Sequence, residues 1–171
     1  AAGIAYNSGG SLRIDKHPGA AHTINFKVPR DSTVVMGHTR MTTQGSALKT
    51  QNNHPFAGNA QGMPFALAHN GTLYNDRFLR KTLKLPNTNI ETDSYVAVQI
   101  IEQMEALNFN SLRYMAEKVE GSFCFTVLDR KNNLYIVKGD NPFCLVHYPE
   151  KGLYLYASTE RILGKALLLL N

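Results

Sequence analysis

Tryptophan is absent from this sequence of 171 residues, and cysteine occurs only twice, as Cys124 and Cys144. Neither cysteine belongs to a CxxC pair or to a spacing typical of zinc ligands. The pattern therefore excludes a disulfide scaffold and a structural zinc site, and it favours a reducing cytoplasmic location. The six histidines also lack metal-ligand spacing, so we expect neither a metal ion nor another cofactor.

Long apolar runs are also missing. No stretch approaches the ~20 apolar residues needed to cross a bilayer, and the N-terminus lacks the basic and then apolar order of a secretory signal. The net charge is only +5, and its main basic concentration has helical spacing, which indicates a solvated helix face. Because aromatic residues are not interleaved with these basic positions, we expect neither nucleic acid nor a membrane as partner. The basic positions are Arg77, Arg80, Lys81 and Lys84.

Length and composition predict one globular domain over residues 1–171, with a sizeable core. Alternating or short apolar runs predict strands, and apolar residues at helical steps predict helices. The order of strands, helices, four more strands and a last helix predicts an α+β fold of two packed sheets sandwiched by helices. The predicted strands are 1–6, 22–28, 33–37, 63–67, 122–128, 134–137, 143–148 and 153–157, and the predicted helices are 76–85, 94–104, 111–118 and 159–170.

The pair Asn70-Gly71 follows the apolar run 63–67 and allows two interpretations. An Asn-Gly pair is a strong hairpin signal, because both residues tolerate a positive φ. Alternatively, the Asn side-chain amide and the open glycine N–H are two neutral donors that can converge on one oxygen, as in an oxyanion site.

Arg40 and Asp93 are the two charged positions that the pattern singles out. Arg40 emerges from an apolar strand and needs a partner there, since an unpaired guanidinium near a core is costly. That partner is either Asp93, in a structural ion pair, or a substrate carboxylate, which the planar guanidinium fork matches. Asp93 precedes an amphipathic helix and is either its N-cap or the counter-ion of an ammonium group.

The last helix has more apolar surface than one stripe requires, because Leu168 and Leu169 lie outside the stripe of Ile162, Leu163 and the following apolar residues. A helix of this kind either docks against a missing domain or partner chain, or is fully buried.

These segments, taken in order, resemble the glutaminase domain of class II glutamine amidotransferases, which are N-terminal-nucleophile hydrolases. The resemblance spans most of the chain and implies a four-layer αββα sandwich. The stretches that carry it are Gly37-His38-Thr39-Arg40, Asn52-Asn53-His54-Pro55, His69-Asn70-Gly71, Thr92-Asp93-Ser94, Gly121-Ser122-Phe123 and Ala157-Ser158-Thr159-Glu160.

The resemblance also implies roles for five residues. Arg40, assisted by Thr43, would bind the α-carboxylate of glutamine, and Asp93 would bind its α-ammonium. Asn70 and Gly71 would form the oxyanion hole. Met41 and Gln44 depart from the Trp and His that are common in the sugar-linked branch of the family.

The largest departure lies at Ala2-Gly3-Ile4, where the family has Cys-Gly-Ile. The family's nucleophile is this Cys thiol, and its own α-amine, with a reference pKa of ~7.7–8.0, serves as the base. Ala2 has no sulfur, and Ala1 in front of it converts the amine into an amide. We expect an inactive Cys-to-Ala form, engineered or naturally degenerate, that still binds glutamine. Cys124 and Cys144 lie in strand-like runs and cannot replace the nucleophile.

The predicted activity of the parent enzyme is hydrolysis of the glutamine side-chain amide to glutamate and ammonia. The expected partners are glutamine or glutamate and a synthetase domain or subunit that accepts the ammonia. Two alternatives remain open at this point. One is a non-catalytic module that binds glutamine or a partner, and the other is a different N-terminal-nucleophile amidase.

Overall fold

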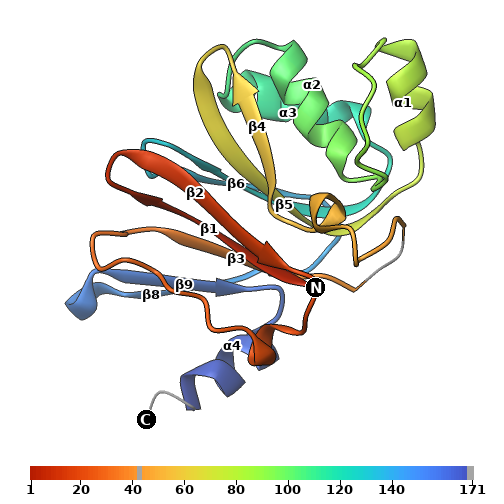
Figure 1. The fold of residues 1–171 in the computed structure, drawn as a ribbon. Coiled ribbons are helices and arrows are strands. Elements are labelled where there is room, and N and C mark those ends of the chain that lie inside the picture. The colour runs from red at the N-terminus through yellow and green to blue at the C-terminus, as the bar shows by residue number, and fades with distance from the viewer. Residues whose placement is uncertain (42–43, 169–171) are drawn as a thin grey trace.

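The computed structural model describes residues 1–41 and 44–168 of the chain (Figure 1). Its strands are β1 (Ala2–Ser8), β2 (Ser11–His17), β3 (Val35–Thr39), β4 (Phe56–Ala60), β5 (Met63–Leu73), β6 (Gly121–Asp129), β7 (Leu134–Lys138), β8 (Cys144–Tyr148) and β9 (Leu153–Ala157). Its α-helices are α1 (Asp76–Thr82), α2 (Tyr95–Gln103), α3 (Phe109–Lys118) and α4 (Glu160–Leu168), and short 3₁₀ turns span Ala21–Thr23, Thr50–Asn52 and Pro149–Lys151.

The first sheet contains the N-terminal strands in the order β2-β1-β3, all antiparallel. The turn Gly9-Gly10 joins β1 to β2, and both glycines have positive φ, as a tight hairpin requires. Because β1 is the central strand, its first residue, Ala2, is paired on both sides, with His17 and with Thr39. The predicted strand at the start of the chain is therefore confirmed.

The second sheet has the order β4-β5-β6-β7, again antiparallel. Helices α1, α2 and α3 cover one face of it (Figure 1). Helix α2 is apolar almost all round and sits in the middle of this layer, which explains why Val96, Val98 and Ile100 are all fully buried. Its side chains and those of β4, β5 and β6 form the main core, in which Phe56, Phe65, Leu67, Ile101, Met115, Phe125 and Val127 are fully buried.

The two sheets face each other across a smaller core made of Ala5, Met36, Ala66, Ala68 and Leu128. Three of these five residues are alanines, so the backbones of the sheets can approach closely here. Helix α4 lies on the opposite side of the molecule from α1, α2 and α3 (Figure 1). The predicted α+β fold with two mainly antiparallel sheets is confirmed, and α4 packs next to β9 rather than over the N-terminal sheet.

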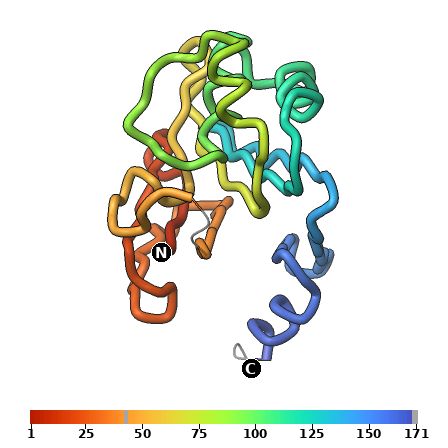
Figure 2. Tube along the Cα trace, turned by 90° about the vertical axis from the view of Figure 1, so that its right-hand side faces the viewer, coloured from red at the N-terminus to blue at the C-terminus, as the bar shows by residue number. Residues whose placement is uncertain are grey.

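Strands β8 and β9 form a separate antiparallel ribbon that continues into α4. Figure 2 shows this C-terminal part in blue, and Tyr156 of β9 packs against the smaller core between the two sheets. In α4 the side chain of Leu163 is buried, whereas Ile162 is 54% and Leu168 is 75% exposed. The alternative of a fully buried last helix is therefore wrong for the described residues; Leu169 and Leu170 lie outside them.

Several predicted boundaries need correction. The predicted strand 22–28 does not form: residues 21–23 belong to a 3₁₀ turn, and residues 24–28 pair with neither edge strand of the sheet. β3 lies two residues later than predicted. Helix α1 ends at Thr82, and the Asn75 side chain does not cap it: it accepts from the Glu120 N–H and donates to the Lys118 carbonyl instead. Apolar spacing alone does not reveal such long-range partners.

The described helices include none that is both long and apolar enough to span a membrane.

Candidate active site

Strand β5 runs past the end of its neighbour β4 before it reaches Asn70 and Gly71. β4 pairs with β5 only as far as Leu67, so one edge of β5 is open beyond that point. On the other edge Gly71 stands opposite Phe123 of β6, whose carbonyl accepts from the Gly139 N–H on the β7 side. The two backbone groups of a residue in an antiparallel strand face the same neighbour. Gly71 therefore points its N–H away from β6, toward the open edge.

Position 71 accepts only glycine. Its φ is +143°, and a Cβ atom there would collide with the carbonyl oxygen of Ser122. The strand continues through this point to Leu73, so the interpretation of Asn70-Gly71 as a hairpin turn is wrong. The same geometry leaves the Gly71 N–H without a side chain beside it, which suits a donor that must reach a ligand.

The residue before this pair, His69, is fixed on both ring nitrogens. Its Nε2 lies 3.3 Å from the Ser122 carbonyl and its Nδ1 lies 2.8 Å from the Ser94 hydroxyl. A carbonyl can only accept, so Nε2 carries the proton and Ser94 donates to Nδ1. The ring also stacks on Phe125 at 4.4 Å. Burial lowers the pKa of His69 to about 4, so the ring is neutral at pH 7 and holds β5 in a fixed place.

Two further histidines, the half-buried His38 and the buried His54, lie close to His69. The Nε2–H group of His38 donates to the His69 carbonyl at 2.9 Å, and the His54 ring lies 4.3 Å from the His38 ring. Burial lowers the pKa of His38 to about 4 and that of His54 well below 6.5. The cluster is therefore uncharged at neutral pH. Within residues 1–41 and 44–168 no three His, Cys, Asp or Glu side chains are placed to hold a metal ion.

Arg40 directly follows β3, and its backbone N–H donates to the Ala1 carbonyl at 2.8 Å. Its guanidinium donates to the Asn53 side-chain oxygen at 2.9 Å, to the Gly45 carbonyl at 3.2 Å and to the Gln44 carbonyl. These hydrogen bonds hold the Arg40 guanidinium in place. Because all three acceptors are uncharged, they do not neutralise its positive charge. Burial lowers the Arg40 pKa, and the nearby negative charge of Asp93 raises it. The two side chains form no direct ion pair among the described residues.

Asp93 is buried, with only 3% of its surface exposed. Its carboxylate accepts from the Leu73 N–H at 2.6 Å, at the end of β5. Helix α2 begins only at Tyr95, after Ser94, and no side chain caps it. The interpretation of Asp93 as a helix cap is therefore wrong, and its negative charge remains available beside the end of β5.

Arg40, Asp93, the three histidines and the Asn70–Gly71 pair line one cavity of about 230 Å³. We call it the polar cavity. A cationic guanidinium and an anionic carboxylate line the same small space, with the Asn70–Gly71 pair in its wall, so it is suited to a ligand that carries both charges. Its lining residues are His38, Thr39, Arg40, Met41, His54, His69, Asn70, Gly71, Thr72, Thr92, Asp93 and Ser94.

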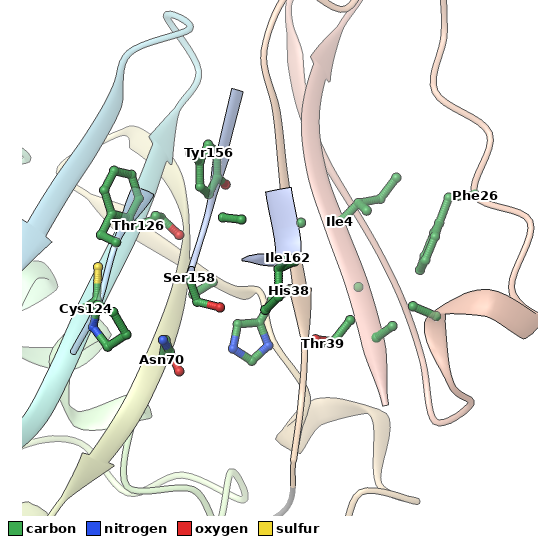
Figure 3. A pocket seen from close by; sticks show the side chains of 18 residues that line it. Ile4, Phe26, His38, Thr39, Asn70, Cys124, Thr126, Tyr156, Ser158 and Ile162 are labelled. Carbon is green, nitrogen blue, oxygen red and sulfur yellow. The ribbon is translucent and has the colours of Figure 1, made fainter. Parts of the chain in front are cut away.

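A second cavity, of about 410 Å³, lies between the two sheets beside Ala2. We call it the apolar cavity. Asn70, Thr39 and His38 line both cavities, and Figure 3 shows His38 between the other two. Ala2 has 2% of its surface exposed and reaches the apolar cavity with its methyl group. Ala2 and Asn70 thus line the same cavity, whereas Ala2 is not among the residues that line the polar cavity.

Neither cysteine has the properties expected of the nucleophile. Cys124 is buried on β6, and burial raises the pKa of its thiol, which makes it a weaker nucleophile. It lines the apolar cavity next to Thr126 (Figure 3). Cys144 is the first residue of β8. Thr43, which we expected to assist Arg40, lies outside the described residues.

Sequence reasoning missed the residues that hold the site in place. These are His38, Lys16, Ser94, Ser122 and Asn141, whose side-chain amide donates to the Asn70 carbonyl at 2.6 Å. Asn141 and Asn70 are 71 positions apart. The only signal available was that His38, Ser94 and Ser122 lie inside the motif stretches, because the contacts of Lys16 and Asn141 depend on the fold.

Comparisons with known proteins show the family and the fold. A family model described as a glutamine amidotransferase domain matches residues 38–165. The chain is 30% identical over 163 residues to a glutamine–fructose-6-phosphate aminotransferase (isomerizing) of Halalkalibacterium halodurans, covering 92% of the chain and 27% of the relative. It is 30% identical over 134 residues to an amidophosphoribosyltransferase of Methanothermobacter thermautotrophicus, covering 75% of the chain and 28% of the relative.

A solved structure agrees in fold. The glutamine phosphoribosylpyrophosphate amidotransferase of B. subtilis, in complex with ADP and GMP, aligns with a TM-score of 0.71 and 20% identity, over 92% of this chain and 35% of that chain. The chain therefore spans only about a quarter to a third of the length of these proteins.

Proposed function

The chain belongs to the class II glutamine amidotransferase family, and on that premise we propose that residues 1–171 are a single glutaminase domain whose polar cavity binds glutamine. One observation carries the proposal: Arg40, Asp93 and the Asn70–Gly71 pair line the same small cavity. The two charged groups match the α-carboxylate and the α-ammonium of one amino acid. A ligand held at both charged ends has its side chain aimed in one direction.

Asn70 and Gly71 supply donors where the side-chain amide of glutamine would lie. The Gly71 N–H points away from β6, and the Asn70 side chain lines both cavities. In a tetrahedral intermediate the amide oxygen becomes an anion, and two neutral donors stabilise it more than they stabilise the starting amide. We assign these two residues to the oxyanion hole.

The parent enzyme would carry a Cys with a free α-amine at position 2. The amine takes the thiol proton, and the sulfur then forms a bond to the amide carbon. Collapse of the intermediate breaks the C–N bond, and the protonated amine supplies the proton that allows ammonia to leave. Water then hydrolyses the γ-glutamyl thioester to glutamate and the free thiol.

Ala2 cannot perform this chemistry, because it has a methyl group in place of sulfur. Its nitrogen is also an amide, joined to the Ala1 carbonyl that accepts from Arg40. We therefore propose that the chain binds glutamine and does not turn it over, as an engineered or naturally degenerate form. Ala2 also favours a second candidate function, a non-catalytic module that binds glutamine; the residue that the native gene encodes at this position separates the two.

Ammonia needs an acceptor, and the relatives named above are longer proteins with transferase activities in their names. We propose that a synthetase or transferase domain, or a separate subunit, receives the ammonia made by the parent enzyme. The expected cellular location is the cytoplasm.

Calorimetry with glutamine on the chain and on Arg40→Ala tests the binding site. We expect the substitution to weaken binding about 10- to 100-fold, because it removes a charge-assisted pair. Arg113→Ala removes an exposed arginine on α3, so it controls for net charge. Equal binding by the chain and by Arg40→Ala would show that the carboxylate site is misassigned.

A further inference from the structure

Lys16 on β2 is a half-buried cation without an acidic partner among the described residues. Its ammonium donates to the main-chain carbonyls of Asn53, at 2.8 Å, and of Pro55, at 3.2 Å. It also stands 5.3 Å from the centre of the Phe56 ring. Taking an ammonium group partly out of water is unfavourable unless its contacts compensate. These three contacts of the Lys16 ammonium all lie within residues 53–56.

Asn53 connects this segment to the proposed substrate site. It is fully buried, and its side-chain oxygen accepts from the Arg40 guanidinium at 2.9 Å. Its side-chain nitrogen donates to the Ala47 carbonyl at 2.7 Å. The main chain of Asn53 is therefore held by Lys16, while its side chain holds Arg40.

The same segment is pressed against β1 next to Ala2. A Cβ atom at Gly3 would collide with the His54 carbonyl and with the Lys16 side chain. Gly3 therefore allows segment 53–55 to lie directly over the strand that carries the nucleophile position. The segment touches β1 through Gly3, β2 through Lys16, and Arg40 at the end of β3.

We propose that Lys16 is a positioning residue for the carboxylate site: by holding the main chain of segment 53–55, it keeps the Asn53 side chain in place to orient the Arg40 guanidinium. This role rests on the proposed function of Arg40. Lys16 does not line the polar cavity, so it acts on the ligand only through Asn53 and Arg40.

The protonation state of Lys16 changes with pH just above neutral. Partial burial lowers the pKa of Lys16 to about 8. The groups that face it from the packed elements are His54, which is neutral, and Arg40 behind Asn53; Asp15 and His17 point to the other side of β2. As the pH rises through about 8, Lys16 loses its charge and its hold on the two carbonyls weakens. Glutamine affinity is then expected to fall.

The test measures the NMR signal of Arg40 and the affinity for glutamine in the full chain and its variants. Lys16→Met keeps the apolar stem and removes the ammonium, and Lys131→Met removes an exposed lysine in the β6–β7 turn as a control. We expect Lys16→Met to shift the NMR signal of the Arg40 Nε–H group without ligand and to weaken glutamine binding about 10-fold. Lys16→Arg should recover part of this loss, and Lys131→Met should change neither measurement.

The pH profile and a second substitution separate positioning from simple stabilisation. Between pH 7 and pH 9, the affinity of the unmodified chain should fall more steeply than that of Lys16→Met, which shares every other titrating group, including the ligand amine. In Asn53→Ala, the further change Lys16→Met should no longer alter the affinity, because the link to Arg40 is already cut.

The outcomes separate this role from the proposed function. An unchanged Arg40 signal in Lys16→Met overturns the positioning role, even if the protein is less stable. A shifted Arg40 signal with unchanged glutamine affinity also overturns it. If the unmodified chain binds no glutamine, the proposed function fails, and the Arg40 signal alone decides whether Lys16 orients the guanidinium.

Discussion

The polar and the apolar cavity share Asn70 but differ in how their walls are held. In the polar cavity the side chains are fixed by hydrogen bonds: Asp93 to the Leu73 N–H, His69 to two partners and Arg40 to three. The apolar cavity is lined on the N-terminal side by Ala2 and on the C-terminal side by α4, whose Ile162 is largely exposed. Hydrogen bonds therefore hold the charged side chains that line the polar cavity, whereas the apolar cavity is lined mainly by apolar side chains beside a partly exposed helix.

This difference separates binding from chemistry. None of the hydrogen bonds that hold the polar cavity involves the side chain at position 2, so a change from Cys to Ala there leaves the binding groups in place. The reaction depends on the atom that position 2 presents beside Asn70. The two functions should therefore be separable by substitution, and the following changes test that separation.

The largest effect is expected from Ala2→Cys made together with removal of Ala1. This double change restores both the sulfur and the free amine. Ammonia release from glutamine should rise from background by at least about 10³-fold, because an activated nucleophile and its base act as one unit. Glutamine affinity should change little. Ala2→Cys with Ala1 retained is the matched control, and equal activity in both proteins would contradict the role of the amine.

In the restored enzyme, Asn70→Ala should lower kcat by about 10²–10³-fold, the usual cost of removing one oxyanion donor. The KM for glutamine should change much less, because the oxyanion exists only during the reaction. Steady-state kinetics measure both values. Asn75→Ala replaces a nearby asparagine outside both cavities, and a similar loss in that variant would argue against a specific role for Asn70.

Gly71→Ala tests whether the backbone of β5 is constrained where it lines the polar cavity. The added methyl group would meet the Ser122 carbonyl at a φ that alanine rarely adopts, so the free energy of unfolding should fall by about 2 kcal/mol or more. Gly164→Ala in α4 is the control: a Cβ atom there has open space, and the change should raise stability by up to about 1 kcal/mol. Urea denaturation measures the free energy of unfolding of both variants. Similar changes in the two variants would mean that β5 is not constrained at Gly71.

The buried histidines predict a pH dependence of stability. Burial lowers the pKa of His38 and His69 to about 4 and that of His54 well below 6.5, the ordinary value. Between about pH 6.5 and pH 4 the unfolded chain binds protons that the folded chain does not, so stability is lost as the pH falls through this window. His54→Leu should reduce the loss between pH 7 and pH 5 by about 1–2 kcal/mol. His22→Gln, at an exposed position, should leave it unchanged.

The sequence predicts the last four strands well, but it does not predict β2 or β4, and β5 runs on to Leu73 where the predicted strand ends at residue 67. Residues 121–157 alternate between apolar and polar positions and are divided by clear turn residues, and β6, β7, β8 and β9 lie within one or two residues of the predicted strands. The same alternation misleads at residues 24–28, where Ile24 and Phe26 turn inward from an extended segment without a pairing partner. Alternation reports which side chains are buried, and it does not report whether a neighbouring strand exists.

The sequence singles out the residues that could contact a ligand, but it does not predict the hydrogen-bond partners that hold these residues in place. Arg40, Asp93, Asn70 and Gly71 stood out because each has a chemical property that its local context leaves unused, and the structure brings them to one cavity. The helix-cap interpretation of Asp93 failed because its partner, Leu73, is 20 positions away. Contacts of this kind arise from the packing of distant segments and leave no local pattern.

Calorimetry with ligands that each lack one charged end tests the central claim most directly. Glutamine has both charges, glutaramic acid lacks the α-ammonium, and 4-aminobutanamide lacks the α-carboxylate. The account predicts that the unmodified chain binds glutamine and that each truncated ligand binds at least about 10-fold more weakly, since each leaves Asp93 or Arg40 without its partner. Equal binding of glutamine and both truncated ligands would contradict it.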